Sequence, residues 1–250
     1  MSRQPPRTSL FDQRIETRKG NASLADIAQR TAHLMISIKN RAFDTALIDH
    51  FCHLVTQYFA AGLVTIVDSP YIHNITAETS DPAEVARRTT TLAMLSQERS
   101  RNVQRRIRHN GATGLNFLPW AELAAQTPAW ITAEVLAAYN RRGAFHAAVA
   151  EQTRKIRGAR AFVMQEESDA FLLEEIPPLI WAYYGLAGGV ADFYPGPQMP
   201  LFWDIDRGRM AAELPRISAL AAGHPGHVYV ELIRRTASSG NGAVARIETP

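Results

Sequence analysis

The stretch "HLMISIKNRAF" (residues 33–43) contains the transition that decides the fold. A short apolar run ends at Ser37 and is followed directly by Lys39, Asn40 and Arg41. An apolar run of this length, bounded by turn residues, is typical of a buried strand, here over residues 32–37. A serine at the end of such a strand is either a cap or turn residue or a nucleophile, and the local pattern favours the cap.

The segments on both sides of this stretch alternate between strand and helix patterns. Residues 43–61 have helical spacing, and residues 63–70 form a second apolar run, so the two runs and the helix make a parallel crossover unit. Further strands are predicted over 113–120, 188–197 and 227–233, with helices from Pro82 to about Asn110, from Thr127, and over about 160–176. The pattern predicts an α/β fold with a Rossmann-like parallel sheet and helices on both faces. Ligands are expected at the carboxyl ends of the strands, where Ser37, Asp68 and Tyr194 fall.

The length and composition bound the organisation of the chain. We expect a flexible lead over 1–25, a single catalytic α/β domain over 26–235 and a flexible tail over 236–250. No segment approaches the roughly 18 apolar residues that a membrane span needs. The polar N-terminus lacks a signal-peptide pattern, and a single cysteine, Cys52, excludes an internal disulfide, so we expect a cytoplasmic protein.

The net charge of +3 is unevenly distributed. Residues 87–108 contain one acid, Glu98, and seven arginines: Arg87, Arg88, Arg99, Arg101, Arg105, Arg106 and Arg108. On a helical wheel, four of them lie opposite the apolar sector and suit a polyanion backbone: Arg87, Arg101, Arg105 and Arg108. Arg99 and Arg106 lie nearer the apolar sector, which periodicity alone does not explain. The chain lacks nucleotide-binding motifs and metal-ligand spacing, so neither a cofactor nor a metal is predicted.

Two further motifs carry groups that could take part in chemistry. In "FLLEEIPP" (171–178), Glu175 shares a helix face with apolar residues, whereas Glu174 should be solvated. Glu175 is therefore either a helix-end residue that reaches water or a buried acid that holds an ammonium group or moves protons. In "DFYPGP" (192–197), Pro195 holds the preceding Tyr194 in an extended conformation at a strand end.

The spacing S-x-x-N-x-x-F of Ser37, Asn40 and Phe43 resembles the opening motif of the tRNA-dependent cyclodipeptide synthases. The arginine-rich helix, "FLLEEIP" and "FYP" follow in the family's order, so the resemblance spans about residues 30–200. It implies a fold similar to the catalytic domain of the class I tyrosyl- and tryptophanyl-tRNA synthetases. It also implies an aminoacyltransferase that joins two aminoacyl groups into a 2,5-diketopiperazine by ping-pong transfer, without ATP. The intermediates are an aminoacyl-serine and a dipeptidyl-serine.

The resemblance also implies roles for individual residues. Ser37 would carry the acyl group, Glu175 would anchor the ammonium group, Tyr194 would assist cyclisation and Asn40 would position the acyl backbone. The aminoacyl pocket would be lined by His33, Met35 and Phe171, and the tRNA phosphates would be held by Arg87, Arg101, Arg105 and Arg108. The implied partners are two aminoacyl-tRNAs per cycle, with a monomeric enzyme and no metal or membrane.

Three departures from the family pattern stand out. Phe171 replaces the usual tyrosine four residues before the glutamate, so one hydroxyl is absent. Met35 replaces the usual glycine, and this bulk, together with His33, implies a small first residue such as Gly or Ala. Asn40 together with Tyr194 and Pro195 mixes two branch patterns, which leaves the branch open. Two alternatives therefore stay open: an inactive tRNA-binding protein on this scaffold, and an unrelated serine acyltransferase or hydrolase with a histidine base near Ser37.

Overall fold

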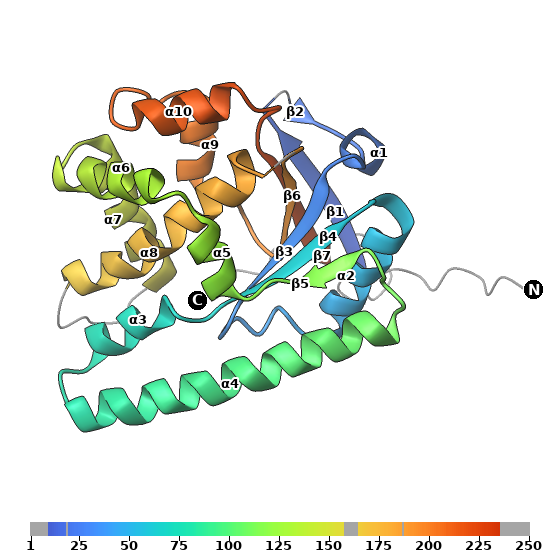
Figure 1. Ribbon diagram of the computed structural model, residues 1–250, viewed down its shortest axis with the longest axis horizontal. Helices are drawn as coiled ribbons and strands as arrows, with labels where there is room; N and C mark the ends of the chain where they lie inside the picture. Colours follow the sequence, from blue (N-terminus) through green and yellow to red (C-terminus); the bar gives the residue numbers. More distant parts are fainter. Residues whose placement is uncertain (1–9, 19, 158–164, 187, 236–250) are drawn as a thin grey trace, which may run out of the picture.

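The computed structural model describes residues 10–18, 20–157, 165–186 and 188–235 (Figure 1). Within these residues, seven strands form one sheet in the order β2-β1-β7-β6-β3-β4-β5. Their bounds are β1 (Phe11–Thr17), β2 (Gly20–Asn21), β3 (Thr31–Ser37), β4 (Gly62–Val67), β5 (Leu115–Phe117), β6 (Val190–Tyr194) and β7 (Val228–Arg234). The run from β7 to β5 is parallel, while β1 joins β7 in antiparallel fashion. The predicted α/β class with a mostly parallel sheet is confirmed.

Helices cover both faces of this sheet. They are α1 (Leu24–Ile27), α2 (Thr45–Tyr58), α3 (Tyr71–Glu78), α4 (Pro82–His109), α5 (Trp120–Gln126), α6 (Ala129–Asn140), α7 (Ala144–Arg157), α8 (Gln165–Tyr184), α9 (Pro200–Asp206) and α10 (Pro215–Ala222). Because side chains alternate along a strand, Leu34 and Ile36 of β3 pack in the core with α2 and α4, whereas Met35 packs in the core with α8. In Figure 1, α4 runs as one long helix beside the rest of the fold.

The segment before residue 26 differs from its prediction. Phe11–Thr17 pairs along its whole length with β7, from Phe11 opposite Arg234 to Thr17 opposite Val228. The prediction of a flexible lead is therefore wrong for this segment; residues 1–9 and the predicted tail over 236–250 lie outside the described residues. The physical reason is burial on one face of β1, where Phe11 is 2% exposed and Ile15 is 7% exposed. Polar residues between the two conceal this alternation in the sequence.

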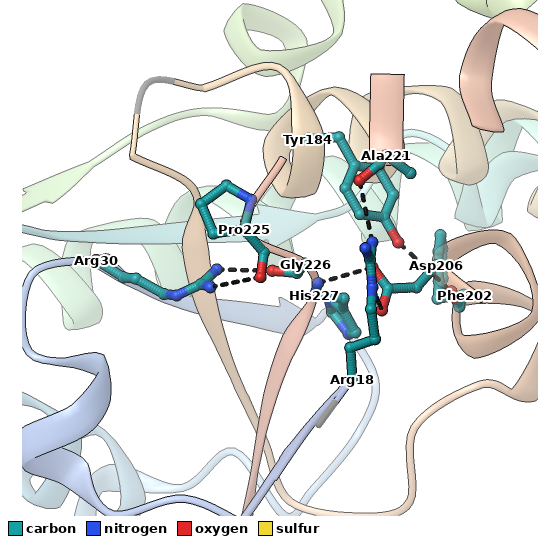
Figure 2. Close-up of polar contacts among 9 residues, drawn as sticks. All are labelled: Arg18, Arg30, Tyr184, Phe202, Asp206, Ala221, Pro225, Gly226 and His227. Carbon is teal, nitrogen blue, oxygen red and sulfur yellow. Dashed lines mark hydrogen bonds and ion pairs between the residues drawn. The ribbon is translucent and has the colours of Figure 1, made fainter. Parts of the chain in front are cut away.

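A buried ion pair fastens this N-terminal strand to the rest of the fold (Figure 2). Arg18 follows β1, and its Nε and Nη2 donate to Asp206 at 2.9 and 2.8 Å. The Asp206 side chain is fully buried, and it also accepts from the backbone N–H of His227 at 2.9 Å. Next to this pair, Arg30 donates to the carbonyl of Gly226 at 2.8 Å. The two arginines thus hold the loop before β7 from the side of the N-terminal segment.

Helix α8 also differs from its prediction, because it continues through Pro177 and Pro178 to Tyr184 instead of ending near residue 176. Proline removes a backbone donor, and in a helix interior this costs about 3 kcal/mol or more. Both prolines are buried, and the core residues on either side of them, Ile176 and Leu179, hold the helix together. Tertiary packing therefore overrides the local stop signal. No helix among the described residues is both long and apolar enough to cross a membrane.

The Arg18–Asp206 pair generates a stability prediction. We expect Arg18→Met to lower the free energy of unfolding by about 3 kcal/mol, because it leaves the buried Asp206 carboxylate without its cation. Urea unfolding measures this change. The matched control is Arg14→Met, on the strand that precedes Arg18. Arg14 pairs with Glu231, but its side chain is 52% exposed, so this variant should cost less than about 1 kcal/mol. Equal losses in the two variants would contradict the role given to Asp206.

Candidate functional site

Ser37 is the last residue of β3 and is partly exposed at the carboxyl edge of the sheet. A compact turn follows it, in which the Asn40 N–H donates to the Ser37 carbonyl at 3.1 Å and the Asn40 side chain accepts from the Ala42 N–H at 2.9 Å. The N-cap of α2 is Asp44, whose side chain accepts from the Leu47 N–H at 3.0 Å. Ser37 therefore does not cap the helix. Its hydroxyl forms no hydrogen bond within the described parts of the chain, which leaves it available to a ligand.

The turn after Ser37 is held by Arg99 of α4. The Arg99 guanidinium donates to four backbone carbonyls of the turn: Ile38 at 2.6 Å, Phe43 at 2.8 Å, Ser37 at 3.3 Å and Asn40 at 3.4 Å. This contact explains why Arg99 lies near the apolar sector of α4, since the side chain points inward to the turn. The sequence analysis did not identify this contact. The position of Arg99 on the helical wheel, away from the four outward-facing arginines, was the feature that could have indicated it.

Arg106 has a comparable explanation. Its Nε donates to Asp49 of α2 at 2.6 Å, and a second hydrogen bond joins the same two side chains. Arg106 therefore fastens α4 to α2 instead of facing solvent. The two arginines that periodicity left unexplained thus anchor the helix on the side that faces the sheet.

Tyr194 lies beside this turn, at the end of β6, the strand next to β3. The Asn40 Nδ2 is 3.5 Å from the Tyr194 hydroxyl, and the Phe43 ring meets the Tyr194 ring edge-on at 5.3 Å between centroids. Burial raises the pKa of Tyr194, and the hydrogen bond from Asn40 opposes this only in part. The phenol therefore keeps its proton at neutral pH. Asn40 and Phe43 of the S-x-x-N-x-x-F motif thus contact Tyr194, and Ser37 lies in the same turn as Asn40.

Glu175 lies on α8, next to Glu174 in the predicted motif. Burial, together with the negative charges of Asp192 and Glu174, raises its pKa from 4.5 to about 8. Glu175 as a residue is only partly buried, but the protein atoms around its carboxyl group are dense enough to make desolvation the largest cause. The charge of Glu175 also raises the pKa of Tyr194, so the two groups share one electrostatic environment.

Asp192 is a second buried acid that the sequence analysis did not identify. It lies on β6 two residues before Tyr194, is 2% exposed, and accepts from the Tyr183 hydroxyl at 2.8 Å. Burial raises its pKa to about 7. Its other oxygen, Oδ1, has no hydrogen-bond partner among the described residues. The signal in the sequence was a lone acid in the apolar strand "VADFY".

Glu174 behaves differently from its neighbour. It accepts from the Ser69 hydroxyl at 2.8 Å, and His73 Nε2 lies 2.8 Å from its other oxygen. These contacts tie α8 to α3 and its N-terminal end, while 38% of the Glu174 side chain stays exposed, in agreement with the predicted solvated position. The bond with His73 is the largest single influence on the pKa of Glu174, which is lowered. Adjacent glutamates therefore carry pKa shifts of opposite sign.

The residues predicted to line the aminoacyl pocket lie on β3 and α8. His33 and Met35 alternate with the apolar residues of β3 and are 1% and 6% exposed. His33 Nε2 lies 3.2 Å from the Thr65 hydroxyl, and burial lowers the pKa of His33 to about 4, so the ring is neutral. The ring of Phe171 on α8 packs edge to face with the ring of Tyr71, with 6.5 Å between the two centroids. Among the described residues, no histidine hydrogen-bonds to Ser37.

The four arginines predicted to bind tRNA are all exposed on α4. Arg87 forms a two-bond ion pair with Glu84, with both bonds at 2.8 Å. Arg101 contacts only the neutral side chain of Gln97, at 3.3 Å, while Arg105 and Arg108 form no ion pair in the described part of the chain. The uncompensated positive charge is therefore concentrated on the C-terminal half of α4. No group of three or more potential metal ligands occurs among the described residues.

Comparison with known proteins identifies the fold. No family model and no curated protein matches the sequence. The structure of a cyclodipeptide synthase from Bacillus thermoamylovorans matches with a TM-score of 0.67 at 11% identity, over 91% of this chain and 97% of that chain. This chain thus has the fold of the cyclodipeptide synthases.

Two further solved structures agree. A Mycobacterium tuberculosis protein, described as showing that cyclodipeptide synthetases are related to type I tRNA synthetases, matches with a TM-score of 0.62 at 13% identity, over 91% of this chain and 96% of that chain. A cyclodipeptide synthase from Candidatus Glomeribacter gigasporarum bound to Phe-tRNAPhe matches with a TM-score of 0.59 at 15% identity, over 90% of this chain and 96% of that chain. The predicted resemblance of the fold to class I synthetases is confirmed.

Arg99 generates a prediction about the turn that it holds. We expect Arg99→Met to accelerate hydrogen exchange at the Asn40 and Phe43 amides about tenfold or more, since charged hydrogen bonds contribute about 1.5–3 kcal/mol each. Exchange followed by mass spectrometry or NMR measures the change. The control Arg101→Met removes an exposed arginine two residues away and should leave these amides unchanged. Equal exchange rates in the wild type and Arg99→Met would contradict the anchoring role.

The raised pKa of Glu175 predicts how stability varies with pH. Between its ordinary pKa of 4.5 and its folded pKa of about 8, the folded state holds a proton that the unfolded state has lost. The free energy of unfolding therefore falls as pH rises through this window, by at most about 1.4 kcal/mol per pH unit for each such group. Glu175→Gln should flatten this fall in urea unfolding between pH 5.5 and 8.5. Asp192 contributes the remaining slope below about pH 7.

The adjacent Glu174→Gln is the matched control for Glu175→Gln. The pKa of Glu174 is lowered, so its stabilising contribution is already complete above pH 5.5 and is lost only at lower pH. This variant should therefore keep most of the wild-type slope between pH 5.5 and 8.5, because the charge of Glu174 is only the smallest of the three causes that raise the pKa of Glu175. A slope in Glu175→Gln as steep as in the wild type would show that Glu175 does not hold its proton at neutral pH.

Proposed function

We propose that this protein is a tRNA-dependent cyclodipeptide synthase, which joins the aminoacyl groups of two aminoacyl-tRNAs into a 2,5-diketopiperazine. The observation that carries the proposal is the turn held by Arg99, in which the unbonded Ser37 hydroxyl lies at the end of β3 and Asn40 donates to Tyr194. The shared fold with cyclodipeptide synthases supports it. One of those structures contains Phe-tRNAPhe, which supports aminoacyl-tRNA as the substrate class.

In the first step, the Ser37 Oγ attacks the ester carbonyl of an aminoacyl-tRNA. The bond between this carbonyl and the ribose oxygen breaks, and the proton from Ser37 passes to the leaving ribose oxygen. The product is an aminoacyl ester on Ser37 together with free tRNA. Because an aminoacyl-tRNA is already an activated ester, this exchange needs no nucleotide hydrolysis. No histidine base is needed if the leaving oxygen takes up the proton.

In the second step, the amino group of the aminoacyl-serine attacks the ester of a second aminoacyl-tRNA. The amine must lose a proton, and the ionised form of Glu175, which is the minor form at pH 7 and about half of the population at pH 8, is suited to take it. Its pKa of about 8 is close to the value of about 7.7–8.0 for an α-amino group, so proton exchange between the two costs little. The bond between the second ester carbonyl and its ribose oxygen breaks, this oxygen takes up the proton removed from the amine, and the second tRNA leaves. A dipeptide remains esterified to Ser37.

In the third step, the free amino group of the dipeptide attacks the ester carbonyl on Ser37. The six-membered diketopiperazine ring closes, the ester bond breaks, and Ser37 regains its proton. Tyr194 is the proton donor suited to this step, since it remains protonated and its hydroxyl is positioned by Asn40. His33 and Met35 would form the floor of the pocket for the first aminoacyl side chain.

Intact-mass analysis after incubation with aminoacyl-tRNA tests the proposal. We expect the wild type to gain one aminoacyl group and to release a diketopiperazine in cultures that express it. Ser37→Ala should lose both the adduct and the product, because the Ser37 hydroxyl carries the acyl group in every step of the proposed mechanism. Ser80→Ala, at an exposed serine between α3 and α4, is the matched control and should keep both.

Two results would replace the proposal with the alternatives. If the wild type forms no adduct but binds tRNA, it is a binding protein on this scaffold, which Phe171 favours. In that case, neutralising Arg101, Arg105 and Arg108 together should reduce the salt dependence of binding by up to about three units of logarithmic slope. If Ser37 is acylated equally well by simple esters without tRNA, the protein is an unrelated acyltransferase.

A further inference from the structure

A groove of about 520 Å³ lies at the carboxyl ends of β4 and β5, between these strands and α4. Its volume falls in the range of about 300–1,000 Å³ that is typical of small-ligand sites. The residues that line it are Ile66, Asp68, Ser96, Gln97, Ser100, Arg101, Phe117, Pro119, Trp120 and Ala121.

One wall of the groove is built for hydrogen bonding. The Asp68 carboxylate is fixed by the Ser69 N–H, which donates to Oδ1 at 2.8 Å, and by the Ser96 hydroxyl, which donates to Oδ2. The side chain of Ser100 lies one turn further along α4. A fixed carboxylate with hydroxyl groups around it is suited to binding the hydroxyls of a ribose, as at the acidic residue of dinucleotide sites.

The other surfaces of the groove complete a set of contacts for a nucleotide. Phe117 and Pro119 provide a flat apolar surface on which a base can stack. Arg101 lines the groove from α4, is exposed, and forms no ion pair within the described residues. A guanidinium in this state is free to bind a phosphate group with two parallel hydrogen bonds.

The groove lies one strand from Ser37. Ser37 and Val67 are partners in the parallel pairing of β3 and β4, and the Ile38 N–H donates to the Val67 carbonyl at 3.3 Å. The next residue after Val67 is Asp68, in the wall of the groove. On α4, Arg99 holds the Ser37 turn, whereas Ser100 and Arg101 line the groove. A ligand in the groove is thus adjacent to the proposed nucleophile.

We propose that the groove binds a ribonucleoside 5′-phosphate, namely the 3′-terminal nucleotide of the aminoacyl-tRNA. The ribose hydroxyls would face Asp68, the base would lie on Phe117, and the 5′-phosphate would bind Arg101. An ester on such a ribose is delivered to the edge of the sheet next to Ser37. The remaining tRNA would follow α4 toward Arg105 and Arg108. This inference rests on the proposed function, because it assigns the place of that function's substrate.

The experiment fills the groove without touching Ser37. Ala121 lines the groove and is exposed, so Ala121→Trp should block it without disturbing the core. Ala125→Trp places the same side chain one turn further along α5, at an exposed residue outside the groove. The probe is adenosine 5′-monophosphate, because every tRNA ends in adenosine. Equilibrium dialysis measures its binding, and intact-mass analysis measures the rate of Ser37 acylation by aminoacyl-tRNA.

We expect the wild type and Ala125→Trp to bind the nucleotide and Ala121→Trp to bind it at least about tenfold more weakly, a difference of about 1.4 kcal/mol. The nucleotide should also compete with aminoacyl-tRNA in the acylation of Ser37. Ala121→Trp should acylate Ser37 more slowly when aminoacyl-tRNA is below saturation. These results together would support the inference.

Other outcomes overturn it in distinguishable ways. If Ala121→Trp acylates Ser37 at the wild-type rate, the groove does not hold the tRNA end, while the proposed function stands. If the nucleotide binds in the groove without competing with aminoacyl-tRNA, the site belongs to a free nucleotide instead. If the wild type is never acylated, the proposed function fails and the tRNA assignment fails with it. Nucleotide binding lost in Ala121→Trp would then still identify a nucleotide groove.

Discussion

The contact between Arg99 and the turn after Ser37 is the constraint on which the arrangement of the candidate site depends. A single guanidinium donates to the carbonyls of Ser37, Ile38, Asn40 and Phe43, of which those of Ser37 and Asn40 also accept backbone N–H groups of the turn. Because all four acceptors are neutral, the cation rigidifies the turn without neutralising a carboxylate. Because the turn is rigid, the Asn40 side chain points toward Tyr194 and Ser37 is fixed at the end of the strand.

Environment assigns different roles to chemically identical side chains in this fold. Glu174 and Glu175 are adjacent on α8, yet one is paired with His73 and has a lowered pKa, while the other is desolvated and has a raised pKa. The helix accounts for this difference, since neighbouring residues point about 100° apart. The same rule divides α4, where Arg99 and Arg106 point inward to fixed partners while Arg105 and Arg108 point outward. Residue type alone therefore does not identify a functional acid or base in this chain.

The sequence contained enough information to predict the parallel strands, the long helix α4 and the residues that meet at the carboxyl edge. These features depend on local periodicity and on strand ends, which are visible in a single sequence. It did not reveal β1, because the partner of β1 is more than 200 residues away and its buried side alternates with polar residues. Nor did it predict that α8 continues through Pro177, since the compensating contacts come from other elements. The Asp192 site was missed because one acid in an apolar strand has no local explanation.

The three sides of α4 together suggest why the helix is so long. A 28-residue helix extends about 42 Å at 1.5 Å per residue, further than is needed to cover the two strand ends near it. Its inner side anchors the Ser37 turn, the adjacent side forms the wall of the groove at Ser96 and Ser100, and its outer side carries Arg105 and Arg108 beyond the edge of the sheet. A substrate that reacts at Ser37 but extends well past the protein would require all three. Phosphate contacts on the outer side would then restrict the orientation of the acyl ester before any contact with its side chain.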